Sequence, residues 1–129
     1  MIGYVLVGTN DLSKATSFYD ALLPTIGGAK LFERPDGGRM YSSGPDQVIF
    51  GVVPPYDGNQ ATVANGGTIG LKADTRAQVD NVHSKALELG GSDEGAPGVR
   101  GAEGDGAFYA AYFRDLDGNK FCVFRIGPP

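Results

Sequence analysis

The chain repeats itself with an offset of 64 residues. Sliding the second half onto the first places Tyr4 on Thr68 and Asn10 on Asp74, and it superimposes the apolar stripes of two helical stretches. Self-similarity of this kind indicates that one supersecondary unit occurs twice. We therefore predict two modules of the same kind, over residues 1–53 and 68–129.

The first copy has the sequence pattern of a βαβββ unit. Residues 4–8 form an alternating apolar run, and Asn10 or Asp11 can cap the helix that follows. That helix is marked by apolar residues at a 3.6-residue period, namely Leu12, Ala15, Phe18, Tyr19, Leu22 and Leu23. Three short strands are predicted after it, at residues 30–34, 39–42 and 47–53, separated by Pro- and Gly-rich turns.

The second copy begins after a connector at residues 54–67. A strand at 68–73 precedes a helix, whose start carries Thr75 and Gln78 at the spacing of a capping box. A weak strand is predicted at 92–94, and an Asp-Gly hairpin joins strands at 107–114 and 119–126. The glycine-rich residues 97–106 form a loop, either a lid over a binding site or a long hairpin connection. The expected class is α+β, with residues 1–129 forming one domain.

Composition excludes several classes of function. The net charge is −4 and the basic residues are scattered, so no nucleic-acid partner is expected. No stretch approaches the ~18 apolar residues that cross a bilayer, so no membrane partner is expected either. The chain has one cysteine, Cys122, which excludes an intramolecular disulfide and fits a reducing compartment. With no signal-peptide pattern at the start, we expect a cytoplasmic protein.

Two motifs resemble those of a known family. Residues 4–19, YVLVGTNDLSKATSFY, are similar to the opening strand and helix of the glyoxalase/bleomycin-resistance/dioxygenase (vicinal oxygen chelate) superfamily. Residues 113–119, FRDLDGN, resemble its closing hairpin, with Leu116 where the family usually has Pro. The resemblance implies two tandem βαβββ modules that form a curved mixed sheet around a cleft. It also implies a small-molecule ligand on the concave face and a homodimer.

The resemblance further implies positions for metal ligands on the first and last strands of each module. These positions fall on Tyr4, Thr68, Cys122 and either Phe50 or Gly51, none of which is His, Asp or Glu. The one histidine, His83, cannot supply a two-His-one-carboxylate site by itself. We expect no metal and no cofactor, with His83 at the edge of the core. A site built from His83 of two chains remains open.

Strand alternation suggests which side chains would line the cleft. The candidate ligand-binding residues are Tyr4, Arg39, Tyr41, Phe50, Thr68, Phe108, Tyr112 and Cys122. Arg39 in a cleft would favour an anionic or carbonyl-bearing ligand. Ordinary packing on a sheet surface is the alternative for Arg39 and the tyrosines. Cys122 is either a nucleophile or a buried, inert thiol.

Three functions compete on this basis. The first is a metal-independent small-molecule-binding protein, in the manner of the drug-sequestering members of the family. The second is a lyase or isomerase, or a dioxygenase-type enzyme, that acts on a carbonyl or thiol-adduct substrate with Tyr4, Tyr112 or Cys122 as acid or base. The third is a structural or protein-interaction role.

Overall fold

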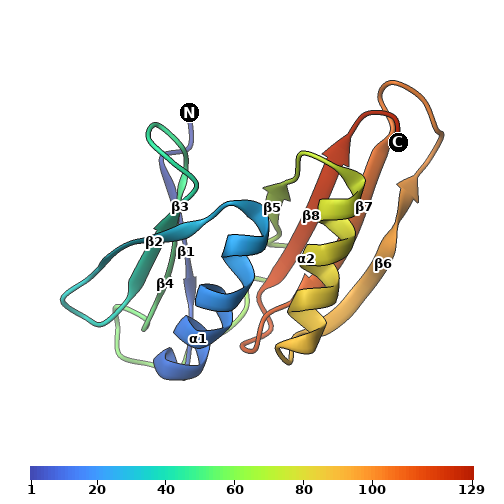
Figure 1. Cartoon of the computed structure of the whole chain (residues 1–129). Helices are drawn as coiled ribbons and strands as arrows, with labels where there is room; N and C mark the ends of the chain where they lie inside the picture. Colours follow the sequence, from blue (N-terminus) through green and yellow to red (C-terminus); the bar gives the residue numbers. More distant parts are fainter. The chain divides into compact units, whose positions relative to one another are not determined.

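A computed structural model describes all 129 residues of the chain. The first module contains β1 (Tyr4–Gly8), α1 (Leu12–Leu22), a 3-10 turn η1 (Leu23–Ile26), β2 (Ala29–Glu33), β3 (Arg39–Ser42) and β4 (Ile49–Val53). The second contains β5 (Ile69–Lys72), α2 (Arg76–Glu88), β6 (Ser92–Arg100), β7 (Phe108–Arg114) and β8 (Lys120–Ile126) (Figure 1). The predicted α+β class and the doubled βαβββ order are confirmed. The chain divides into two compact units, Met1–Ala64 and Asn65–Pro129.

Each module has its own four-stranded mixed sheet with the same topology. The strand orders are β1-β4-β3-β2 and β5-β8-β7-β6, and in both sheets the first pair is parallel and the others antiparallel. The registers also agree: Gly51 lies opposite Leu6 and Met40, as Cys122 lies opposite Gly70 and Tyr112. Gly51, and not Phe50, is therefore the structural counterpart of Cys122.

The two helices begin at side-chain caps. Asp11 accepts a hydrogen bond from the Lys14 amide at 3.0 Å and is the cap of α1, whereas the side chain of Asn10 bonds to the backbone of Ala61. Thr75 caps α2 by accepting from the Gln78 amide at 3.1 Å. The Gln78 side chain accepts in turn from the amide of Asp74, one residue before the position in a standard capping box.

One face of each helix is buried against the sheet of its own module. The buried residues of the two helices are Ala15, Thr16, Phe18, Tyr19 and Leu22 in α1, and Val79, Val82, His83 and Ala86 in α2. Beneath α2, the rings of Phe113 and Phe121 stack at 5.3 Å between centroids, and both are fully buried. Burial of a side chain of this size stabilises the fold by about 1.5–3 kcal/mol.

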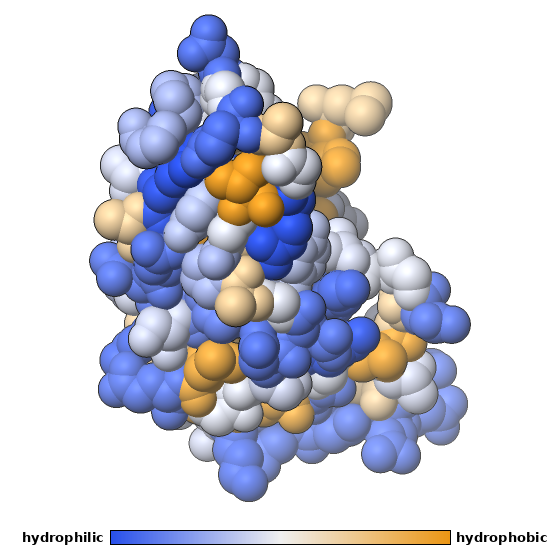
Figure 2. All heavy atoms as spheres, turned by 90° about the vertical axis from the view of Figure 1, so that its right-hand side faces the viewer, coloured by the Kyte–Doolittle hydropathy of each residue, from blue (hydrophilic) through white to orange (hydrophobic).

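Strand β6 is longer than the weak strand predicted at 92–94, because it runs to Arg100 through a stretch containing Gly95, Pro97 and Gly98. These residues lowered the strand signal, but an edge strand with shifts in register tolerates them. Seen from the β6 side, the surface is mostly hydrophilic, with hydrophobic residues in small separate patches (Figure 2). A polar, irregular edge of this kind discourages pairing with another chain.

Residues 101–107 connect β6 to β7, and they include the rest of the predicted loop, 101–106. Glu103 in this connection accepts two hydrogen bonds from the Arg76 guanidinium, at 2.6 and 2.9 Å. Because this ion pair ties the connection to the start of α2, the hairpin alternative describes it better than a lid. Neither helix of the chain is long and apolar enough to cross a membrane.

Candidate functional site

The two faces of each sheet differ, because the helix of the module packs on only one of them. We call the opposite side the helix-free face. In the second module this face carries Phe108, Ala110 and Tyr112 of β7 together with Cys122 and Phe124 of β8, since residues paired across neighbouring strands point to the same side. Tyr109, in contrast, points toward α2 and donates to Asp80 at 2.7 Å. The predicted residues Phe108, Tyr112 and Cys122 therefore lie together.

The centre of this face is a phenol beside a thiol. Tyr112 lies directly opposite Cys122 in the antiparallel pair, and the two side chains are close enough to affect each other's pKa. Burial raises the pKa of the Cys122 thiol, and the opposing influence of Tyr112, Arg100 and Lys120 does not cancel this effect. Burial and the contact with Cys122 also raise the pKa of Tyr112. Both groups are consequently protonated at neutral pH.

Aromatic rings extend the site along the same face. Phe108 and Phe124 lie with their ring centroids 5.4 Å apart, and both are half-buried. The Phe124 ring extends toward Gly70 of β5, the register partner of Cys122, where an added Cβ would meet the ring at 3.1 Å. The glycine thus leaves room for the ring. An apolar surface with a few polar groups is the usual composition of a small-molecule site.

Two cations flank the Tyr112 ring: Lys120, which the sequence suggests only as a neighbour of Cys122, and Arg100, which the sequence did not place at the site. The guanidinium carbon of Arg100 lies 5.6 Å from the ring centroid and the Lys120 ammonium nitrogen 5.5 Å from it, distances typical of cation–π contacts. Arg100 was missed because its segment was expected to be a loop. Lys120 shares the strand face of Cys122, and this alternation was the available signal.

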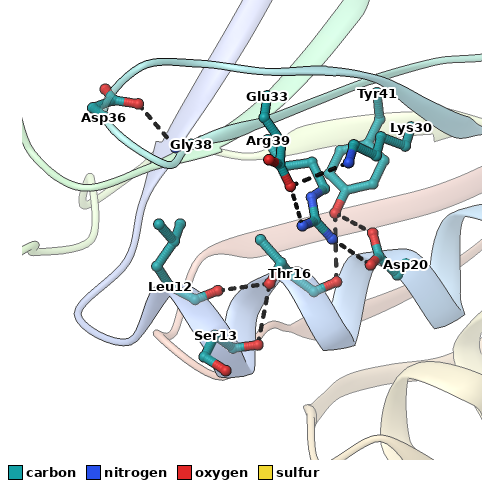
Figure 3. A network of polar contacts seen from close by, with 10 residues as sticks. All are labelled: Leu12, Ser13, Thr16, Asp20, Lys30, Glu33, Asp36, Gly38, Arg39 and Tyr41. Carbon is teal, nitrogen blue, oxygen red and sulfur yellow. Dashed lines mark hydrogen bonds and ion pairs between the residues drawn. The ribbon is translucent and has the colours of Figure 1, made fainter.

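In the first module, Arg39 and Tyr41 lie elsewhere than expected. They share one face of β3, as predicted, but it is the face that packs against α1 (Figure 3). Tyr41 is fully buried and donates to Asp20 of α1 at 2.8 Å. Burial and this bond raise the pKa of Tyr41 far above its usual range. The expectation that these residues reach the same cavity as Tyr4 is therefore wrong.

The charge of Arg39 is neutralised within the module. Its guanidinium nitrogens bond to Asp20 and to Glu33, each at 2.5 Å, and Glu33 also accepts from Lys30 at 3.1 Å (Figure 3). Hydrogen bonds from Arg39 and Lys30 lower the pKa of the Glu33 carboxyl. The helix-face network of Asp20, Glu33, Arg39 and Tyr41 is structural, and alternation alone could not show which face α1 covers.

Phe50 belongs to the same buried face, because its ring centroid is 4.9 Å from that of Tyr19 in α1. Tyr4 is on the helix-free face of the first module and is 65% exposed. Thr68 is exposed and lies just before β5. A hollow of about 500 Å³ between the start of β2 and the loop at 43–48 is lined by residues that include Lys30, Ser42 and Asp46, and by none of the predicted site residues.

These features define a class: an α+β protein of two βαβββ modules, each with a helix on one sheet face. The family model "Glyoxalase/Bleomycin resistance protein/Dioxygenase superfamily" matches residues 1–123. The chain belongs to this superfamily. No curated protein matches it.

Solved structures agree with this assignment. The chain is 36% identical to a glyoxalase/bleomycin resistance protein from Albidiferax ferrireducens, with a TM-score of 0.86 and coverage of 97% of this chain and 98% of the other. A glyoxalase/bleomycin resistance protein/dioxygenase family enzyme from Burkholderia phytofirmans is 18% identical, with a TM-score of 0.71 and coverage of 96% and 97%. A glyoxalase-related enzyme from Fulvimarina pelagi is 14% identical, with a TM-score of 0.72 and coverage of 97% and 87%. The last two share the fold.

The family's metal positions hold poor ligands in this chain. They carry Tyr4, Gly51, Thr68 and Cys122, and a divalent ion of the expected kind needs several imidazole or carboxylate groups. At Gly51 a Cβ would lie 2.4 Å from the sulfur of Met40 and 2.6 Å from Leu6 Cδ2, so apolar side chains fill the ligand's place. No group of three His, Cys, Asp or Glu side chains converges anywhere in the chain. The donor set does not fit the metal.

His83 is engaged inside the second module. It is 6% exposed on α2, and its Nε2 lies 2.9 Å from the Asp93 carboxylate on β6. Hydrogen bonds from the Gly95 amide and from His83 lower the pKa of Asp93. This contact gives His83 a structural role at the edge of the core.

Proposed function

We propose that this chain is a metal-independent small-molecule-binding protein whose binding surface is the helix-free face of the second module. The observation that carries the proposal is the clustering of Phe108, Tyr112, Cys122 and Phe124 on two neighbouring strands, on the side that α2 does not cover. Half-buried rings supply apolar contact area, and the phenol supplies an oriented hydrogen-bond donor.

The protonation of the central pair favours binding over covalent catalysis. A cysteine nucleophile acts as the thiolate, and the pKa of Cys122 is raised by burial. Tyr112, whose pKa is also raised, is a donor at neutral pH and not a base. The raised pKa values of Cys122 and Tyr112 thus support a site that holds a ligand by contact and hydrogen bonding.

An enzyme of the lyase or isomerase class is the second candidate, and the Tyr112–Cys122 contact is the observation that favours it. A protonated Tyr112 could serve as a general acid toward a carbonyl substrate. Hemithioacetal isomerisation by the wild type and by Tyr112→Phe tests this role. Turnover that is lost in Tyr112→Phe would establish the enzyme, whereas ligand binding without turnover supports the binder.

Metal independence is tested by equilibrium dialysis against Zn, Ni, Fe and Mn, followed by elemental analysis. We expect less than one tenth of an equivalent of ion per chain, on the order of non-specific retention, because the donor set is poor. A single tightly held ion per chain would overturn metal independence. Repeating the dialysis with Cys122→Ala would show whether that ion sits at the family's position.

We also propose that the protein acts as a homodimer. Tyr4, Leu6 and Phe32 are exposed on the helix-free face of the first module, and apolar side chains of this size favour burial in an interface. Sedimentation velocity of the wild type and of a Tyr4→Asp, Phe32→Asp variant tests the assembly. A monomeric wild type at tens of micromolar, on the order of a moderate dimer affinity, contradicts it.

The binding surface is tested by a fragment screen with amide chemical-shift mapping. We expect fragments that contain an aromatic ring to shift the signals of residues on β7 and β8, and Phe108→Ala to weaken their binding. Leu116→Ala, at an exposed position in the turn between β7 and β8, is the matched control. Shifts confined to the hollow near Ser42 and Asp46 would contradict the proposed site.

A further inference from the structure

Some cationic side chains of the chain are paired with a carboxylate, and others are not. The guanidinium groups of Arg39, Arg76 and Arg114 each form an ion pair with a carboxylate, at 2.5–2.6 Å. Arg100 and Lys120 take part in none of the ion pairs of the chain. In a protein with a net charge of −4, two uncompensated cations therefore meet at the proposed binding face.

The Arg100 side chain is held in place before any ligand arrives. Its terminal nitrogens donate to the backbone carbonyls of Gly98 at 2.9 Å and Ala96 at 2.8 Å. Glycines make this path possible, since a Cβ at Gly95 would lie 3.1 Å from one guanidinium nitrogen and a Cβ at Gly98 3.3 Å from the other. Neutral carbonyls orient the guanidinium without cancelling its charge. Such preorganisation lowers the entropic cost of binding a partner.

Lys120 approaches the Tyr112 ring from β8, the strand on the other side of β7 from β6. The positive charges of Arg100 and Lys120 both act to lower the pKa of the Cys122 thiol. Both charges are therefore felt at the Tyr112–Cys122 pair. In the β6–β7–β8 registers, Phe108 and Phe124 follow along the same face. The face thus has two cations around Tyr112 and two aromatic rings beyond it, where the exposed Lys72 of β5 is paired with Phe124.

We infer that the ligands of this face are small organic anions, with an aromatic or apolar body on Phe108 and Phe124 and a carboxylate or similar group between Arg100 and Lys120. The inference rests on the proposed function and specifies its ligand class. A guanidinium fork matches a carboxylate, and Tyr112 adds a neutral donor beside it. Arg100 thus takes the role that the sequence reasoning gave to Arg39.

A matched pair of probes tests the inference: naphthalene-2-carboxylate and naphthalene-2-carboxamide, which differ in charge and hardly in shape. Binding of each to the full chain is measured by ligand-observed NMR titration. The carboxylate is expected to bind about tenfold more tightly than the amide, the scale of one or two charge-assisted contacts at a partly exposed site. Raising the salt concentration should weaken the carboxylate only.

Three variants locate the charge that matters. Arg100→Gln and Lys120→Gln are each expected to weaken carboxylate binding about three- to tenfold and to leave the amide unchanged. Arg125→Gln is the control: it removes the same charge from β8 on the side that carries Tyr109, and Arg125 has no carboxylate partner either. Circular dichroism confirms that each variant is folded.

The outcomes separate the two proposals. If both probes bind equally and Phe108→Ala weakens both, the anion inference is overturned and the proposed binding face stands. A carboxylate preference that survives both Arg100→Gln and Lys120→Gln also overturns the inference. If neither probe binds at millimolar concentration and the fragment screen is empty, the proposed function fails, and the inference fails with it.

Discussion

The two modules share one backbone plan and use the same positions differently. In the first, the central position of the helix-free face is Gly51, and Met40 and Leu6 close over it. In the second, the same position is Cys122, with Tyr112 and Gly70 as its neighbours. In the first module apolar side chains therefore occupy this position, whereas the second module has a phenol, a thiol and two cations around it. A duplicated module allows the two copies to differ in this way, because one copy is enough to provide the proposed binding face.

On the helix-covered faces the polarity is reversed, because the first module is polar there and the second is apolar. The first module places the polar network of Asp20, Glu33, Arg39 and Tyr41 beneath or beside α1 (Figure 3). At the positions of Tyr41 and Phe50, the second module has Phe113 and Phe121 stacked in an apolar core. A partly exposed polar network and a buried apolar stack respond differently to mutation and pH. Four tests of the comparison follow.

The largest expected effect comes from the apolar stack. Phe113→Ala should lower the free energy of unfolding by about 3–5 kcal/mol, because it removes a fully buried ring and leaves a cavity. Urea denaturation followed by circular dichroism measures the loss. Phe108→Ala, at a half-buried position on the same strand, is the control and should cost less than half as much. Similar losses in both variants would show that the helix-free face is packed as tightly as the core.

The second-largest effect is expected at the two glycines of the helix-free faces, whose replacement by alanine should cost different amounts of stability. Gly51→Ala is expected to destabilise the protein by about 1–3 kcal/mol, since its Cβ would collide with buried Met40 and with Leu6. Gly70→Ala should cost below about 1 kcal/mol, because its nearest neighbour, the half-buried Phe124 ring at 3.1 Å, can turn away. The same urea experiment compares the pair. Equal costs would contradict the view that only the first module is filled.

Tyr41→Phe tests the polar network. Loss of the hydrogen bond to Asp20 should cost about 1 kcal/mol at neutral pH. The raised pKa of folded Tyr41 also means that folding favours the protonated phenol. Its contribution to stability is complete below the unfolded pKa near 10.0 and is lost as the pH rises above it.

The variant should therefore lose less stability than the wild type between pH 9 and 11, a window chosen about that pKa. Urea midpoints across the window measure the slope. Tyr56→Phe, which changes a fully exposed side chain, is the control and should follow the wild type. An unchanged slope in Tyr41→Phe would assign the alkaline sensitivity to Tyr109, Tyr112 or Cys122, whose pKa values are also raised.

The smallest effect concerns Cys122. A disulfide reagent should react slowly with the folded protein at pH 7.5, because the thiol is 6% exposed and burial raises its pKa. Arg100→Gln should slow the reaction by a further factor of about two, since that cation stabilises the thiolate. Arg125→Gln should leave the rate unchanged. A faster reaction in Arg100→Gln would mean that access, and not charge, limits the rate.

Much of the fold was predictable from local patterns. The 3.6-residue period of Ala15, Phe18 and Leu22 and the caps at Asp11 and Thr75 act within a few residues, so they can be read directly. The Asp-Gly turn before β8 is equally local. The exception is β6, whose glycines and proline weaken the local signal although pairing with β7 makes it a strand. Membership of the superfamily also followed from motifs at the two ends of the chain.

The site was predictable only in part. Alternation correctly grouped Phe108, Tyr112 and Cys122, and correctly grouped Arg39 with Tyr41. For β3 it could not say which face the helix would cover, because an alternating strand presents two faces and the choice is made by packing between elements distant in sequence. Arg39 was therefore placed in the cleft, although Asp20 and Glu33 neutralise it.

By itself, then, the sequence determined the repeat, the order of elements and the residue types at the family's metal positions. Those properties depend on local backbone preferences and on the identity of single residues. The tertiary structure decided that Arg100 lies beside Tyr112, that Arg39 is neutralised, and that Gly51 matches Cys122. Each of these depends on strand register and long side chains that meet across the sheet or against a helix, and no local pattern encodes such meetings.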